Sequence, residues 1–285
     1  MDVQKALHLH IEEAKKNPKH IGLEYMLFEK HDGWFGYLDF PSCLIHSRQL
    51  RPIPSVVELS NKIRSKRPNT NGRLIFEIMI EGLEIDSFHE LNGILNRKRE
   101  QVEGVYLRVH DFIPDFLHCT MPADKRYKFA EEIVTSLDLP EVIMSPILGV
   151  TQDMAEAREL CETLWAQNKE GIILKQKDGL YQSGKRNYSL MKIKEEVTLD
   201  LRVHDVFEGK DKYIGTLGGL ILKDKNHVLH KVSGMSDEDR DLWWKDPSLI
   251  VGKIVEVKAM KKLANGSLRE ARFKAVRHDK IDTDD

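Results

Sequence analysis

The 285-residue sequence lacks the patterns that mark several protein classes. Its three cysteines, Cys43, Cys119 and Cys161, lie far apart without a CxxC pair, which argues against a disulfide framework or a zinc site and favours a reducing compartment. No apolar run approaches the length of a membrane span, and the first residues have no signal-type apolar core. HExxH, P-loop and GxSxG strings are absent as well. We therefore expect a cytoplasmic protein with no membrane partner.

The sequence also lacks an excess of either charge. Its 44 basic and 46 acidic side chains leave a formal net charge of -2. Bulk charge therefore identifies no partner, and any contact with nucleic acid has to come from local basic patches.

The first two thirds of the chain alternates helical and strand-like patterns. Apolar periodicity and two Ser-x-x-Glu capping boxes predict helices at residues 3–16, 55–67, 87–99, 124–138 and 152–167. Apolar runs between them predict strands, namely GLEYMLFE, WFGYLDF, RLIFEIMI, GVYLRVHDFI, EGIILKQ and YSLMKIK. We expect an α+β domain with an extensive sheet over residues 1–195.

From residue 196 onward the chain consists of short strands separated by turn residues. The strand-like strings are VTLDLRVHDVFEG, YIGTLGGLILKD, HVLHKVSGM, LIVGKIVEVKAM and SLREARFKAVR. A helix is expected over SDEDRDLWWKD, and Asn265-Gly266 is a strong hairpin signal. Five strands in this length predict a small β-barrel over residues 196–285.

A lysine stands two residues ahead of an Asp-Gly pair in EKHDGWFGY. Lys30 is expected at the end of an apolar strand, beside a turn at Asp32-Gly33. A lysine amine becomes nucleophilic when burial or nearby cations lower its pKa. Lys192 and Lys194, two residues apart on one face of a strand, are candidates for those cations. Converging lysines favour a phosphate ligand.

Two glutamates stand alone in apolar strands. They are Glu77 in LIFEIMI and Glu170 in EGIILK, and single carboxylates of this kind suit a divalent cation that bridges phosphate oxygens. Each feature also has a simpler interpretation, because strand glutamates and alternate lysines commonly face solvent. The order of the motifs along the chain favours the functional interpretation.

Five short motifs follow one another in an order that resembles the covalent nucleotidyltransferases, which include DNA ligases, RNA ligases and mRNA capping enzymes. The motifs are KHDG at 30–33, FE at 76–77, VHDF at 109–112, EGIILK at 170–175 and LMKIK at 190–194. The strings from residue 215 onward, and the closing RHDK at 277–280, look like the OB domain and last motif of ATP-dependent DNA ligases. A compact phage-type ligase is the nearest match.

The resemblance implies a nucleotidyltransferase (adenylation) domain at 1–195 and an OB-fold barrel at 196–285. It implies that Lys30 attacks the α-phosphate of ATP to form lysyl-AMP. The AMP then passes to the 5'-phosphate of a nick in duplex DNA, and the 3'-hydroxyl displaces it. Mg²⁺ or Mn²⁺ would assist, and a monomer acting in replication, repair and recombination, in a bacterial or phage-infected host cytoplasm, is expected.

The resemblance also assigns roles to individual residues. The catalytic residues would be Lys30, Asp32, Lys192, Lys194, Arg277, Asp279 and Lys280. The nucleotide-binding residues would be Glu29, Lys30, Glu77, His110, Glu170, Lys175, Lys192 and Lys194. The metal ligands would be Glu170, Glu77 and Asp32, and the DNA-binding residues Arg48, Lys185, Arg186, Lys261 and Lys262.

Three positions depart from the family pattern. Phe35 occupies the place of an arginine in KxDGxR, which leaves a ribose contact unassigned, and Ile75-Phe76 replaces Asp-Gly. His110 stands where an aromatic residue stacks on adenine; a neutral imidazole can stack too, but a core histidine is the alternative.

Two other functions remain open from the sequence alone. An RNA ligase or a capping-type guanylyltransferase would share the lysine chemistry. A non-catalytic nucleic-acid binder would use the OB domain alone.

Overall fold

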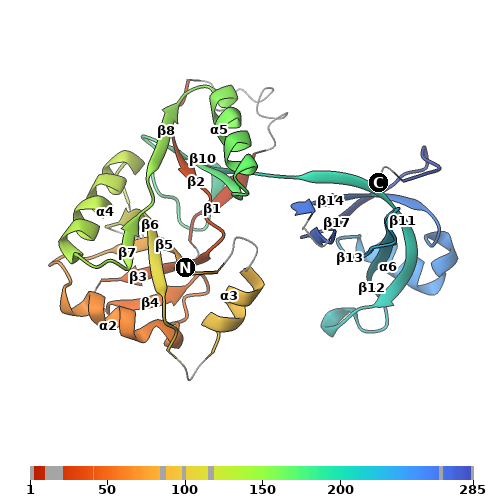
Figure 1. Ribbon diagram of the computed structural model, residues 1–285, viewed down its shortest axis with the longest axis horizontal. Coiled ribbons are helices and arrows are strands. Elements are labelled where there is room, and N and C mark those ends of the chain that lie inside the picture. The colour runs from red at the N-terminus through yellow and green to blue at the C-terminus, as the bar shows by residue number, and fades with distance from the viewer. Residues whose placement is uncertain are drawn as a thin grey trace. The chain divides into compact units, whose positions relative to one another are not determined.

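The computed structural model describes residues 3–9, 22–40, 42–83, 88–97, 101–114, 119–262 and 266–283. The chain divides into two compact units, Met1–Lys194 (unit 1) and Glu195–Asp285 (unit 2), shown in Figure 1. No helix in the described ranges has both the length and the apolar character needed to cross a bilayer. All three cysteines are buried free thiols.

Unit 1 is built on two five-stranded sheets. The first has the order β1-β10-β9-β2-β8 and consists of β1 (Lys5–His8), β2 (Tyr25–Glu29), β8 (Ile147–Thr151), β9 (Gly171–Gln176) and β10 (Arg186–Lys194). The second has the order β4-β3-β5-β6-β7 and consists of β3 (Trp34–Asp39), β4 (Leu44–Ser47), β5 (Arg73–Ile80), β6 (Val105–Ile113) and β7 (Val142–Met144). Neighbouring strands are antiparallel except for the pairs β1–β10 and β6–β7.

Helices cover one face of each sheet in unit 1. The helices are α2 (Val57–Ser65), α3 (Phe88–Leu95), α4 (Ala123–Leu137) and α5 (Met154–Ala166). Ile63 of α2 and Ala130 of α4 belong to the same hydrophobic core as Phe76 of the second sheet, while Cys161 of α5 shares a core with Leu174 of the first. The expected helices and strands between residues 55 and 194 are confirmed to within a few residues.

Two local predictions in unit 1 are wrong. Residues 5–8 form strand β1 rather than part of a helix, because they pair in parallel with β10, and residues 10–16 lie outside the described ranges. Ser55 does not cap α2: its hydroxyl donates to the Leu95 carbonyl (2.8 Å), and a 3-10 turn (Pro54–Val56) precedes the helix. The second proposed capping serine, Ser87, also lies outside the described residues.

The break at Asp32-Gly33 carries the chain from one sheet to the other. Strands β2 and β3, on either side of the break, belong to different sheets and do not pair. A Cβ atom on Gly33 would lie 2.9 Å from both the Cβ of Glu77 and the carbonyl oxygen of Ile78. Glycine is therefore required here by the close approach of β5, and this approach sets Lys30 next to Glu77.

Unit 2 contains a five-stranded antiparallel sheet in the order β13-β12-β11-β14-β17. Its strands are β11 (Val197–Glu208), β12 (Leu217–Lys223), β13 (Leu229–Val232), β14 (Ile254–Ala259) and β17 (Arg272–Val276). A parallel bridge between Ser233 and Arg272 joins the two edge strands, with the amide of Phe273 donating to the carbonyl of Ser233 (2.8 Å). This arrangement is an OB-type sheet whose edges meet at one bridge within the described residues, and the α+β fold class is confirmed.

The remaining elements of unit 2 follow the sequence pattern. Helix α6 (Asp237–Lys245) is capped by Ser236, whose side chain accepts from the amide of Asp239 (3.1 Å). Short strands β15 (Lys261–Lys262) and β16 (Leu268–Arg269) pair as a hairpin around Gly266, while Asn265 lies outside the described residues. Two short 3-10 turns, Asp211–Tyr213 and Pro247–Leu249, complete the unit.

Candidate active site

Unit 1 encloses a cavity of about 190 Å³ that is lined from both of its sheets. The first sheet contributes Lys30, at the end of β2, and Lys192 of β10. The second contributes Phe35 of β3, Glu77 of β5 and His110 of β6. Residues far apart in the sequence therefore meet in one place.

Lys30 lies against the start of β9. Its backbone amide donates to the Gly171 carbonyl (2.9 Å), and its Nζ forms an ion pair with Glu170, whose side chain is only 7% exposed. Gly171 has a φ of +144°, and a Cβ atom there would clash with the Ile193 carbonyl. The glycine after Glu170 thus lets β9 approach β10 closely enough to bring the glutamate onto the lysine.

Lys192 brings a second ammonium to the cavity. Burial, together with Lys30 and Lys194, lowers the pKa of Lys192. In the part of the chain that the structure describes, its side chain has no hydrogen-bond or ion-pair partner. An uncompensated ammonium in a partly buried cavity is a site for an anion.

Glu77 is a carboxyl group in an unfavourable setting for charge. Burial raises its pKa to about 8, although Lys30 and Arg48 act in the opposite direction. Glu170 and Asp32 lie near enough to raise it further. Within the described ranges no three acidic, histidine or cysteine side chains form a ready metal cage. Mg²⁺ is usually held by one or two carboxylates plus substrate phosphates, and Glu170 and Glu77 fit that donor set.

His110 lines the cavity and is half-buried. Burial, and then the charge of Lys175, lowers its pKa to about 3, so the imidazole is neutral at neutral pH. A neutral ring on the cavity wall is what stacking on a base requires.

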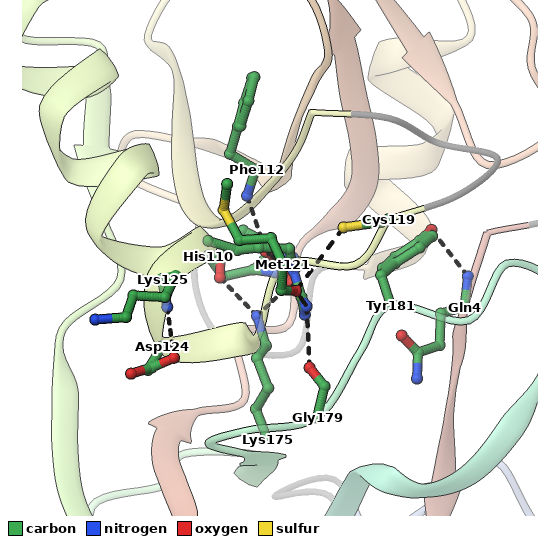
Figure 2. Close-up of polar contacts among 12 residues, drawn as sticks. Gln4, His110, Phe112, Cys119, Met121, Asp124, Lys125, Lys175, Gly179 and Tyr181 are labelled. Carbon is green, nitrogen blue, oxygen red and sulfur yellow. Dashed lines mark hydrogen bonds and ion pairs between the residues drawn. The ribbon is translucent and has the colours of Figure 1, made fainter.

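Lys175 belongs to a buried ionic network that Figure 2 displays. Its Nζ donates to Asp111 (2.9 Å) and to the His110 carbonyl (2.7 Å). Arg126 of α4 holds the same carboxylate through two bonds (2.9 and 3.2 Å) and donates to the Gly179 carbonyl (3.0 Å). Burial alone would raise the pKa of Asp111, but Lys175 and Arg126 lower it to about 2.

This network ties three parts of the cavity wall together. Asp111 lies on β6 next to His110, Lys175 lies on β9, and Gly179 lies in the turn that follows β9. Asp111 and Arg126 had no assigned role in the sequence. A single arginine in an amphipathic helix resembles a solvated one, so only the three-dimensional contact identifies it.

Two more of the expected residues, Glu29 and Arg186, line the cavity. The pKa of Glu29 is lowered to about 2, chiefly by a hydrogen bond from His31 and also by Lys169, whose Nζ lies 3.1 Å from it. Arg186, at the start of β10, lines the cavity, and Lys185 precedes it on the exposed surface.

In unit 2 the two basic residues of the RHDK motif, Arg277 and Lys280, meet at the buried carboxylate of Asp200, and Asp279 pairs with Arg277. Arg277 donates to Asp200 (2.8 Å) and Asp279 (2.7 Å), and Lys280 Nζ lies 2.5 Å from Asp200. The role of Asp200 was not predicted, because one aspartate in a strand gives no local signal. The remaining basic pair, Lys261 and Lys262, lies on β15, and Lys262 is 3.8 Å from Asp224.

The site combines a lysine, a second ammonium and two carboxyl groups around a cavity lined from both sheets of unit 1, and unit 2 forms an OB-type sheet of its own. The chain belongs to the ATP dependent DNA ligase domain family, whose model matches residues 39–194. The matched range contains His110, Glu170 and Lys192 and begins after Lys30.

Curated relatives include two phage enzymes. The chain is 25% identical to the DNA ligase of Enterobacteria phage T4 over 186 residues, which cover 58% of this chain and 37% of that protein. It is 24% identical to the phage T6 DNA ligase over 240 residues, covering 74% of this chain and 48% of that protein. The aligned region spans about half or less of each relative's length.

Solved structures show the same fold. One comes from a study of Lig E DNA ligases and of DNA binding with a minimal scaffold. It matches with a TM-score of 0.75 and 20% identity, over 97% of this chain and 99% of that one. At this identity the likeness concerns the fold, including both units.

Proposed function

We propose that the protein is an ATP-dependent DNA ligase that seals 5'-phosphate/3'-hydroxyl nicks in duplex DNA. The observation that carries the proposal is the placement of the Lys30 amine in a cavity beside Glu170 and near the Lys192 ammonium. An amine among phosphate-binding groups is suited to covalent attack on phosphorus.

In the first step Lys30 Nζ attacks the α-phosphorus of ATP. A nitrogen–phosphorus bond forms, the bond between the α-phosphorus and the bridging oxygen breaks, and pyrophosphate leaves. The amine loses its protons to solvent. Lys192 and Lys194 neutralise the charge that develops on the α-phosphate, as phosphoryl transfer depends mainly on positioning and charge neutralisation.

In the second step the AMP moves from Lys30 to the 5'-phosphate at the nick, which gives an adenylated end. In the third step the 3'-hydroxyl attacks that phosphate and AMP leaves. Asp32 assists these later steps, and the basic residues Arg48, Lys185, Arg186, Lys261 and Lys262 contact the DNA backbone.

Other groups bind the nucleotide and the metal. His110 stacks on adenine, and Lys175 holds the adjoining wall. Glu170, Glu77 and Asp32 would hold Mg²⁺ or Mn²⁺, and the ion would supply positive charge that offsets the negative charge of the phosphates. Arg277, Asp279 and Lys280 orient the β and γ phosphates, for which the two cations have to leave Asp200. We place the enzyme, as a monomer, in the cytoplasm of a bacterial or phage-infected cell.

The test is covalent labelling. Incubation with ATP labelled in the α-phosphate should give an acid-labile adduct that is lost in Lys30→Ala and retained in Lys177→Ala, a lysine paired with Glu24 on the surface. Labelling by GTP instead would indicate a capping-type enzyme, and sealing of nicked RNA alone would indicate an RNA ligase. Binding of nicked DNA without any adduct would indicate a non-catalytic binder.

A further inference from the structure

Position 35 faces the cavity directly beside Glu77. Phe35 of β3 and Glu77 of β5 are opposed partners in an antiparallel pair, so their side chains lie on the same face of the sheet. Both line the cavity. The aromatic ring can neither donate a hydrogen bond nor carry charge, so position 35 itself brings no cation to Glu77.

Arg48 fills that space from the neighbouring strand. The next antiparallel pair along β3 and β4 joins Gly36 to Ser47, and continuing this register sets Arg48 opposite Phe35. The guanidinium carbon lies 4.8 Å from the centre of the Phe35 ring. This distance is that of a cation–π contact. Glu77, Phe35 and Arg48 thus form one row on the cavity side of the sheet.

The backbone around Arg48 is held in a tight turn. The amide of Ser47 donates to the carbonyl of Arg51 (2.9 Å), and the amide of Leu50 donates to the carbonyl of Ser47 (3.0 Å). Leu50 adopts a φ of +62°, which a turn of this kind requires. The position of Arg48 is therefore defined at the backbone by the turn and at the side chain by the Phe35 ring.

The Arg48 guanidinium is positioned but not neutralised. It lines the same cavity as Lys30 and Lys192 and acts on the charge of Glu77. Over the stretches that the structure describes, it makes no hydrogen bond or ion pair. A guanidinium with five free donors on the wall of a cationic cavity is suited to bidentate contact with a phosphate.

We propose that Arg48 binds the phosphates of the nucleoside triphosphate during the adenylation of Lys30, and that Phe35 is the positioning residue that holds Arg48 there. This assignment rests on the proposed function and deepens it. It gives Arg48 a role in the first step, before any DNA is bound, in addition to the nick contact proposed above.

The experiment measures the formation of lysyl-AMP without DNA, at a series of ATP concentrations. Arg48→Ala should raise the KM for ATP by roughly tenfold, which corresponds to the loss of a charge-assisted hydrogen bond. Arg48→Lys should recover only part of this loss, because an ammonium cannot make the bidentate contact. Arg51→Ala is the matched control: it removes an exposed arginine from the same turn and should leave KM unchanged.

A double-mutant cycle separates positioning from structural damage. Phe35→Leu should raise the KM for ATP in the wild-type background but have little further effect in the Arg48→Ala background. Phe35→Tyr keeps the aromatic ring and should leave the KM at its wild-type value. An unchanged KM in Arg48→Ala, with a wild type that forms the adduct, would overturn this inference and leave the proposed function standing. An equal effect of Phe35→Leu in both backgrounds would overturn the role of Phe35. A wild type that forms no adduct would overturn both proposals.

Discussion

Replacing Asp111 by asparagine should destabilise unit 1 strongly. The carboxylate is shared by Lys175 and Arg126, and none of the three side chains is more than 6% exposed. Removing one partner from a buried ion pair costs about 3–5 kcal/mol, because the remaining charges are left without compensation. Asparagine keeps one acceptor oxygen, so we expect the lower end, about 3 kcal/mol.

The lowered pKa of Asp111 indicates how much the charged carboxylate stabilises the fold and over which pH range that stabilisation is lost. Its folded value of about 2 lies below the ordinary 3.8. The stabilisation is therefore complete above about pH 4 and is lost as the pH falls toward 2, and a shift of this size corresponds to about 2 kcal/mol. In Asp111→Asn this acid-dependent part of the stability should disappear.

The assay is unfolding in urea, monitored by the hydrogen–deuterium exchange of peptides from β6 and β9. Both strands lie in unit 1, so the exchange reports on that unit alone. The control is Glu162→Gln, which removes a carboxylate from an exposed i,i+4 pair with Arg158 and should cost about 0.5 kcal/mol or less. If Asp111→Asn cost no more than this control, the reasoning about the buried network would be refuted.

Three further predictions follow from the site. Gly171→Ala should abolish formation of lysyl-AMP and lower the melting temperature, because its Cβ would clash with Ile193; an active, stable variant would contradict the role of the glycine. The raised pKa of Glu77 predicts that stability falls as the pH rises from 4.5 to about 8, and melting curves of Glu77→Gln should lack this slope. Five phosphate contacts predict that doubling the salt weakens nick binding by roughly twentyfold, and a titration that shows no loss would exclude backbone contacts of this kind.

The strands that contain the motif residues could be predicted, because their local sequence patterns are strong. EGIILK and LMKIK combine β-branched or apolar runs with charged residues at fixed positions, and they form β9 and β10 as expected. Strand β1 could not be predicted, because its pairing with β10 joins Lys5 to Arg186 across most of unit 1. A four-residue segment such as KALH is too short for its pattern to distinguish a strand from a helix.

Residues with a strong local signal were expected to lie together, whereas residues that act through distant partners were not expected. Lys30, Glu77, His110 and Lys192 line one cavity, as the motif order indicated. Arg126 and Asp200 organise other functional groups through contacts that connect distant segments, and only folding brings those partners together. The contact between Arg48 and the Phe35 ring is likewise visible only across paired strands.

Peptide mapping by mass spectrometry after incubation with ATP and Mg²⁺ tests the central claim most directly. The account predicts one adenylyl group per chain, carried by the peptide that contains Lys30 and released when pyrophosphate is added. An unmodified Lys30 in protein that binds ATP, or an adenylyl group on a different lysine, would contradict it.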